Sequence, residues 1–111
     1  MVFINSDSGE ATAVDGNEGD RKNLTAWHNG DALVAAVAEQ NNNTIVVVHS
    51  VGPIIIEPWI EHPNVTAVVW AGLGGTETGN ALVMCFMVTL TRLAACLTLL
   101  PKTSVTTVHS L

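Results

Sequence analysis

Glu10 is the side chain in this sequence best placed for acid and base chemistry. It ends the segment Ser6-Asp7-Ser8-Gly9-Glu10, which follows a short apolar run, Val2 to Ile4, that predicts the end of a strand. Open α/β sheets bind ligands beyond the carboxyl ends of their strands, and a carboxylic acid there can donate and accept a proton. The residues alone leave an ordinary exposed loop glutamate as the open alternative.

A glycine-rich segment, GLGGTETG, follows a predicted strand and precedes a predicted helix. This is the context of a dinucleotide-binding fingerprint, but the spacing is wrong: after Gly72 and Gly74, the third glycine position is occupied by Glu77. The segment therefore predicts a tight strand-to-helix turn, and no cofactor is expected.

Metal sites and a serine nucleophile are not predicted either. The acidic segment 15–20 places Gly19 fifth, where a calcium loop of the EF-hand type needs glycine sixth. No nucleophile elbow of the form G-x-S-x-G surrounds Ser8 or Ser50. The histidine and cysteine residues do not have the spacing of metal ligands; they are His28, His49, His62, His109, Cys85 and Cys96.

Three sequons for N-glycosylation are present, at Asn23, Asn42 and Asn64. All three lie in polar segments that flank or begin predicted elements, which is typical of the surface of a secreted glycoprotein. The sequence therefore gives these three asparagines as candidate glycosylation sites.

The elements expected to position these residues alternate between strand and helix. Continuous β-branched runs at 44–48 and 65–70 predict strands buried on both faces, as in a parallel sheet. A helix is predicted from Asp31 to the Asn41 run, with Asn29 or Asp31 as its N-cap. The order predicts an α/β fold.

Two further helical segments complete this pattern. Residues 54–61 predict a short crossover helix or turn, interrupted by Pro58. A last helix is predicted to begin at Gly79, after the glycine-rich segment.

Length and charge bound the class of protein. The 111 residues make one domain at most, with ten acidic against four basic side chains and a net charge of -6. Scarce and scattered lysine and arginine argue against nucleic acid as a partner and against a basic membrane-surface helix. The first residues, Met1 to Asn5, lack the charged and apolar regions of a signal peptide, so no leader is expected in this chain.

Residues 2–83 resemble the α/β-sandwich domain of secreted fungal-type β-glucosidases of glycoside hydrolase family 3. The stretches that carry this resemblance are SDSGE, VDGNEGDRKNLTAWHNGDALV, NNTIVVVHSVGP, EPWIEHPNVTAVVWAGL and GNALV. The resemblance implies that the chain is an incomplete three-layer α/β sandwich with a parallel sheet. It also implies that the chain is a small internal segment of a much longer enzyme, and that this enzyme is extracellular.

The resemblance further implies a catalytic role for Glu10. In that family a (β/α)₈ barrel supplies an aspartate nucleophile, and the sandwich domain supplies the acid/base glutamate in a motif of the form SGEGY. Ser8-Gly9-Glu10 matches this motif, whereas Ala11-Thr12 departs from it where the family has glycine and an aromatic residue. The implied reaction is retaining hydrolysis of β-glucosides such as cello-oligosaccharides. The barrel partner, with its nucleophile, is missing from this chain.

The tail departs from the family after Val83. All ten acidic residues precede residue 84, whereas residues 84–111 contain only Arg92 and Lys102 as charges. The family continues with a sequence like DVLYG, and shifting the codons of residues 84–88 by one base permits D, L and Y and forces V and G. The tail is therefore interpreted as an out-of-frame translation.

A membrane span and a non-catalytic product are the alternatives to these interpretations. Residues 81–100 are mostly apolar, but Arg92 at mid-span would cost about 2.5 to 3.5 kcal/mol in a bilayer, so no membrane span is expected. As an alternative to a β-glucosidase fragment, the product is a truncated non-catalytic α/β module or a gene-model artefact. A β-glucosidase fragment and a non-catalytic module would share the same α/β fold.

Overall fold

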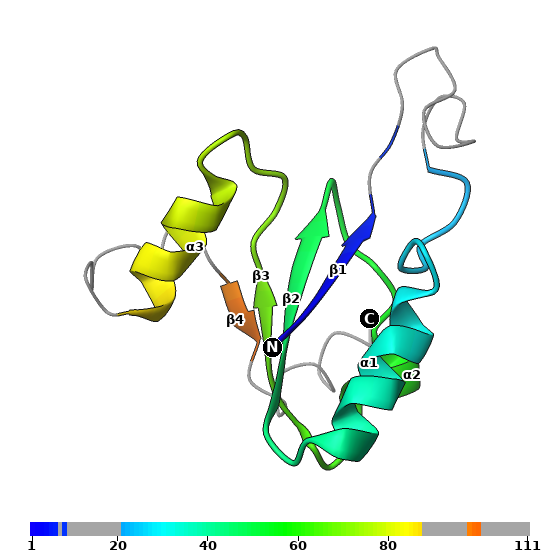
Figure 1. Ribbon diagram of the computed structural model, residues 1–111. Helices are drawn as coiled ribbons and strands as arrows, with labels where there is room; N and C mark the ends of the chain where they lie inside the picture. The colour runs from blue at the N-terminus through cyan, green and yellow to red at the C-terminus, as the bar shows by residue number, and fades with distance from the viewer. Residues whose placement is uncertain (7, 9–20, 88–97, 101–111) are drawn as a thin grey trace.

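The structure of the protein is a computed structural model, which describes residues 1–6, 8, 21–87 and 98–100. These residues form a sheet with helices packed beside it (Figure 1). In chain order the elements are β1 (Val2–Ser6), α1 (Gly30–Gln40), β2 (Thr44–Ser50), α2 (Glu57–Ile60), β3 (Val65–Trp70), α3 (Thr78–Phe86) and β4 (Thr98–Leu100).

The sheet has the strand order β1-β2-β3-β4. The first three strands are parallel, with Ile4 opposite Val48 and Val46 opposite Val68. The parallel α/β arrangement predicted from the β-branched runs is therefore confirmed. The short β4 pairs with β3 in the antiparallel sense and was not predicted, because its three residues carry no strand pattern of their own.

The hydrophobic core lies between the sheet and the first two helices. α1 contacts β1, β2 and α2, and Figure 1 shows α1 and α2 beside each other. Val34 and Ala38 lie one turn apart on α1 and are fully buried, as the spacing of four residues dictates for one helix face. They join a cluster that includes Val46, Val68 and Trp59.

The bounds of α1 agree with the prediction, and Asn29, one of the two predicted N-cap residues, occupies the N-cap position. It has φ 58° and makes no side-chain capping hydrogen bond. In this left-handed conformation Asn29 shapes the turn into the helix instead. Pro58 does not interrupt α2: it lies in the first turn, where a missing N–H costs no hydrogen bond.

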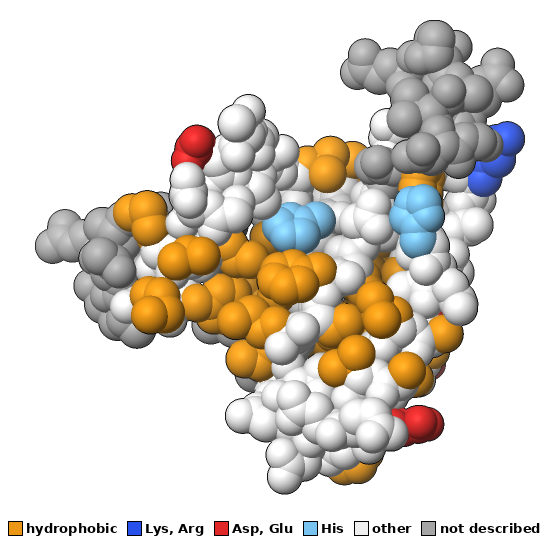
Figure 2. All heavy atoms as spheres, in the orientation of Figure 1, with side chains coloured by type: hydrophobic (Ala, Val, Ile, Leu, Met, Phe, Trp, Pro, Cys, Tyr) orange, Lys and Arg blue, Asp and Glu red, His pale blue; other side chains and the backbone are white. Residues whose placement is uncertain are grey.

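Hydrophobic side chains are exposed on the face of β1 that points away from the core and on α3. Figure 2 shows a broad apolar area over the strands that extends toward α3. Its elements carry several side chains that are at least 40% exposed, among them Phe3, Leu73, Val83, Met84 and Met87. Apolar areas of this kind are normally covered by further protein.

We expect the isolated 111-residue chain to unfold over a broad temperature range, without a cooperative two-state transition. Among the described strands, β1 pairs only with β2, which leaves its other edge without a partner strand. The exposed apolar area also lowers the stability of the isolated chain. Scanning calorimetry of the purified chain tests this. A sharp transition with equal calorimetric and van't Hoff enthalpies would contradict it.

The predicted boundary after Val83 falls within α3, which continues to Phe86. Most of the tail, at 88–97 and 101–111, lies outside the described residues. Among the helices that the structure describes, none is long and apolar enough to cross a membrane.

Candidate functional site

The carboxyl ends of the three parallel strands form one polar edge of the sheet. β1, β2 and β3 end at Ser6, Ser50 and Trp70, so the loops that follow them emerge from the same side. In open α/β sheets this is the edge where ligands bind. β1 ends at this edge, four residues before Glu10 in the sequence.

Glu10 itself lies outside the described residues, but the strand end that precedes it is firmly held. The carbonyl oxygen of Asn5 accepts a hydrogen bond from the Trp27 N–H at 2.9 Å. The next carbonyl oxygen, of Ser6, accepts one from the Val51 N–H at 3.2 Å. These bonds fix the point from which the segment departs.

Arg21 fixes the point at which the described chain resumes. Its Nη1 donates a hydrogen bond of 2.8 Å to the carbonyl oxygen of Pro53, in the loop that follows β2. A Cβ atom on Gly52 would lie only 3.0 Å from Nη2 of Arg21, so glycine leaves room for the guanidinium. Ser6 and Arg21, which are described on either side of this segment, therefore both contact the loop after β2.

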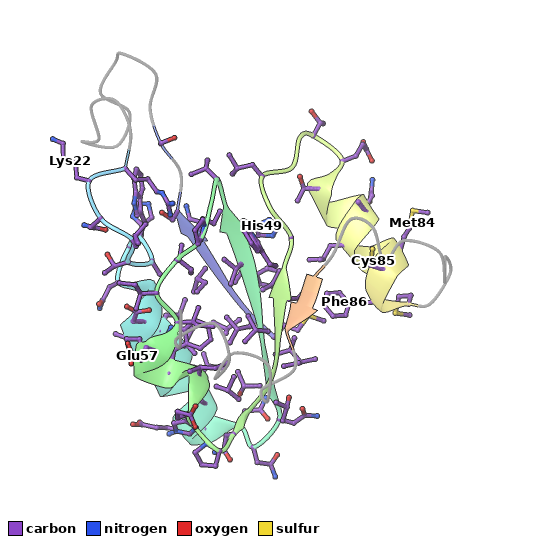
Figure 3. The ribbon with its side chains drawn as sticks, turned by 180° about the vertical axis from the view of Figure 1, so that it is seen from behind. Lys22, His49, Glu57, Met84, Cys85 and Phe86 are labelled. Atoms are coloured by element: carbon purple, nitrogen blue, oxygen red, sulfur yellow. The ribbon has the colours of Figure 1, made fainter. Side chains whose placement is uncertain are left out.

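A shallow cavity of about 270 Å³ lies at the same edge, lined by Asn5, His49, Leu73, Gly74 and Thr78. Figure 3 shows His49 close to the carboxyl end of β2. Its Nδ1 is 3.2 Å from the carbonyl oxygen of Gly72, and its ring stacks on Phe3 with the ring centroids 6.4 Å apart. The residues that line the cavity thus combine polar side chains with the apolar side chain of Leu73.

The two buried serines at this edge differ in their hydrogen bonds. Ser50 Oγ donates to the carbonyl oxygen of Gly52 at 2.5 Å, which closes the turn after β2. Ser6 is fully buried, and its Oγ has no partner among the described residues. Neither arrangement pairs the hydroxyl with a base, which a serine nucleophile requires.

The glycine-rich segment forms the predicted turn between β3 and α3. Gly72 has φ 64°, a conformation that glycine adopts without strain. Thr78 then begins α3, with its Oγ1 donating to the carbonyl oxygen of Gly75 at 2.6 Å. A Cβ atom on Gly74 would collide with the Thr78 side chain, so this glycine also serves close packing.

The other predicted site residues are spread over the fold. In the described part of the chain, no group of three or more metal-ligating side chains occurs. The acidic segment 15–20 lies outside it. Asn23 and Asn42 are exposed, and Asn64 is half-buried.

Sequence reasoning missed two residues that shape this edge. Arg21 was not singled out, and His49 was considered only as a metal ligand. Their contacts with Pro53 and Gly72 join residues 32 and 23 positions apart in the chain. No local spacing signals such pairs.

The family model described as "Glycosyl hydrolase family 3 C-terminal domain" matches residues 1–88. Beta-glucosidase 1 of Aspergillus aculeatus is 63% identical over 83 residues, which are 74% of this chain and 10% of that protein. Probable beta-glucosidase A of Aspergillus fumigatus is 62% identical over 84 residues, again 10% of its length. The chain thus spans about a tenth of the curated relatives it matches.

Solved structures give the same answer for the fold. Beta-D-glucoside glucohydrolase from Trichoderma reesei superposes with a TM-score of 0.72 at 63% identity, covering 75% of this chain and 12% of that one. A Chaetomium thermophilum beta-glucosidase gives a TM-score of 0.76 at 52% identity, covering 80% of this chain and 11% of that one.

Proposed function

Because this chain belongs to glycosyl hydrolase family 3, within its C-terminal domain, we propose that it is part of a β-glucosidase. The complete enzyme would release glucose from terminal non-reducing β-D-glucosyl groups, in the degradation of cellulose and related polysaccharides. The observation that carries this proposal is the match of residues 1–88 to the family, together with relatives named β-glucosidases at 63% and 62% identity.

Glu10 would be the acid/base of this enzyme. The support is that Ser8-Gly9-Glu10 matches the family motif and follows β1, which ends at the edge where open α/β sheets bind ligands. In a retaining mechanism, two carboxyl groups about 5 to 5.5 Å apart act as nucleophile and acid/base. Glu10 would protonate the departing glycosidic oxygen and then deprotonate the water that releases glucose.

The nucleophile would come from a barrel domain of the same enzyme, outside this chain. A single carboxylate cannot both attack the anomeric carbon and protonate the leaving group, so two are required. We therefore expect the 111-residue chain alone to release no detectable glucose from cellobiose. Glucose formation that disappears in Glu10→Gln would contradict this, whereas hydrolysis by the complete enzyme would support the proposed activity.

A truncated non-catalytic module remains the second candidate, and the tail is what favours it. The alignments with the curated relatives extend over 83 or 84 residues, which is close to the 83 residues that precede the predicted frame change. Sequencing the gene and its transcript across residues 80–90 tests this. If one added base restores a DVLYG-like sequence, the tail is out of frame; an intact frame with this tail leaves the non-catalytic module.

We also propose an extracellular location for the complete enzyme. The support is the presence of three sequons on the described surface or close to it. Fractionation of a culture of the source cells, with detection of the enzyme in the medium or in the cells, tests this location.

A further inference from the structure

The loop between β2 and α2 is hydrogen-bonded to the described chain on either side of the segment that contains Glu10. Before that segment, the Val51 N–H donates to the carbonyl oxygen of Ser6, the last residue of β1, at 3.2 Å. After it, Nη1 of Arg21 donates to the carbonyl oxygen of Pro53 at 2.8 Å. A single loop therefore bonds the residues that precede and follow the segment.

This loop is itself fixed to the sheet. Ser50, the buried last residue of β2, donates through Oγ to the carbonyl oxygen of Gly52 at 2.5 Å, and the Gly52 N–H lies 3.3 Å from the same Oγ. Further along the loop, the Ile55 N–H donates to the carbonyl oxygen of Leu24 at 2.7 Å. A group that is bonded to this loop is therefore held relative to the carboxyl ends of the strands.

Gly52 leaves a space that the guanidinium group of Arg21 occupies. A Cβ atom on Gly52 would lie 3.0 Å from Nη2 and 3.9 Å from Cζ of Arg21, and these are the described atoms within 4 Å of it outside its chain neighbours. The φ of Gly52 is not in the left-handed region, so its backbone conformation does not require glycine. The absence of a side chain at this position thus serves the contact with Arg21.

The hydrogen bond from Arg21 is of the strong kind, because its donor is charged. Bonds from ionised donors are roughly twice as strong as those between neutral groups. Arg21 is half-buried, whereas its neighbour Lys22 is exposed and projects outward (Figure 3). A loop whose ends are both held has fewer conformations available, and a catalytic group needs support of this kind to stay in its productive position.

We propose that Arg21 is a positioning residue for Glu10. By donating to Pro53 in the space that Gly52 leaves, it fixes the chain directly after the segment and thereby keeps the acid/base carboxyl group within reach of the glycosidic oxygen. The inference rests on the proposed function, because Arg21 acts through Glu10 and not on the substrate.

The first test replaces Arg21 in the complete enzyme. Arg21→Met keeps an unbranched apolar side chain and removes the donors, so it should lower kcat/KM for cellobiose by about 10- to 100-fold, the scale expected for displacing a catalytic group by about 1 Å. Arg21→Lys keeps a charged donor and should recover most of this loss. Lys22→Met makes the matched change at the exposed neighbour and should leave kcat/KM unchanged. Thermal melting of each variant shows whether the enzyme is folded.

Double variants show whether Arg21 acts through Glu10 and Gly52. Arg21→Met added to Glu10→Gln should cause no further loss, because the proton transfer that Arg21 supports is already absent. Gly52→Ala should lower kcat/KM less than Arg21→Met does, and its effect should disappear in the Arg21→Met background, where the guanidinium group is gone.

The outcomes separate this inference from the function on which it rests. Parental activity in Arg21→Met, together with a large loss in Glu10→Gln, would overturn the inference and leave the proposed function standing. An equal loss from Arg21→Met with and without the Glu10 carboxylate would assign Arg21 to folding only and would also overturn it. Parental activity in Glu10→Gln would overturn the acid/base assignment and the inference together.

Discussion

Replacing Glu10 with glutamine in the complete enzyme is expected to lower kcat/KM for cellobiose by about 10²- to 10⁴-fold, the usual contribution of a positioned general acid and base. Glutamine is nearly the same size as glutamate and cannot donate or accept the proton that the leaving glucose and the attacking water require. The folded enzyme should therefore retain its substrate pocket and lose its chemistry. Steady-state kinetics with glucose detection measures the effect.

The choice of substrate separates lost proton transfer from a disturbed loop. A nitrophenyl leaving group departs with little help from an acid, so the first chemical step of Glu10→Gln should be impaired less with an aryl glucoside than with cellobiose. A misplaced loop would impair both substrates alike. Glu39→Gln, an exposed change in the last turn of α1, serves as the matched control and should leave both rates unchanged. A loss below about tenfold with cellobiose would remove Glu10 from the acid/base role.

The fold of this segment could be predicted largely from local patterns. The run Thr44–Val48 contains no alternation of polar and apolar residues, and β2 indeed buries residues on both faces of the sheet. Such a strand belongs in a parallel sheet flanked by other layers, and this property is encoded in adjacent residues. The same holds for α1, whose fully buried Val34 and Ala38 follow the helical period.

The candidate site could not be predicted in that way. Glu10 has the character of any loop glutamate until the family motif is considered, because the acid/base role proposed for it would depend on a second carboxylate from outside this chain. Arg21 and His49 make their important contacts with backbone carbonyl groups of distant residues, and a carbonyl group has no sequence signature. The position of Asn29 at the N-cap could be predicted from its residue type, whereas its left-handed conformation and the absence of a side-chain capping hydrogen bond could not.

Gly30 illustrates a constraint that only the assembled fold reveals. A Cβ atom at this position would lie 2.8 Å from Cβ of Ala26 and 3.1 Å from Cγ2 of Ile4. The first residue of α1 therefore packs its backbone directly against β1. In the sequence this glycine reads only as a turn signal.

Trp59 is expected to be the side chain whose removal weakens this segment most. It is 2% exposed in α2 and lies in the core cluster between α1 and the sheet. Its Nε1 donates a 2.8 Å hydrogen bond to Oδ1 of Asp31 in the first turn of α1. Trp59→Ala should lower the unfolding free energy of the segment by about 3 to 5 kcal/mol, because it removes the transfer energy of the ring and leaves a cavity.

The hydrogen bond and the packing of Trp59 can be separated. Trp59→Phe keeps an aromatic ring in the cluster but loses the hydrogen-bond donor. The unfolding free energy should fall by about 1.5 to 3 kcal/mol, the range for a hydrogen bond to a charged acceptor. The loss is smaller where water replaces the donor at half-buried Asp31. A double-mutant cycle that combines Trp59→Phe with Asp31→Ala measures the interaction energy between the two side chains. In the double variant, Asp31→Ala removes an acceptor that has already lost its donor.

Hydrogen exchange in the complete enzyme, read at the amides of β2 and β3, reports the stability of this segment within a multidomain protein. The control is Leu33→Ala on the exposed side of α1, where the side chain is 47% exposed and the change should stay within about 0.5 kcal/mol. If Trp59→Ala raised exchange in β2 and β3 no more than Leu33→Ala does, α2 would not hold the sheet together, and the first two helices would not form a single core layer. A large increase in exchange for Trp59→Ala, a smaller one for Trp59→Phe and none for Leu33→Ala would instead show that packing of this ring stabilises the sheet.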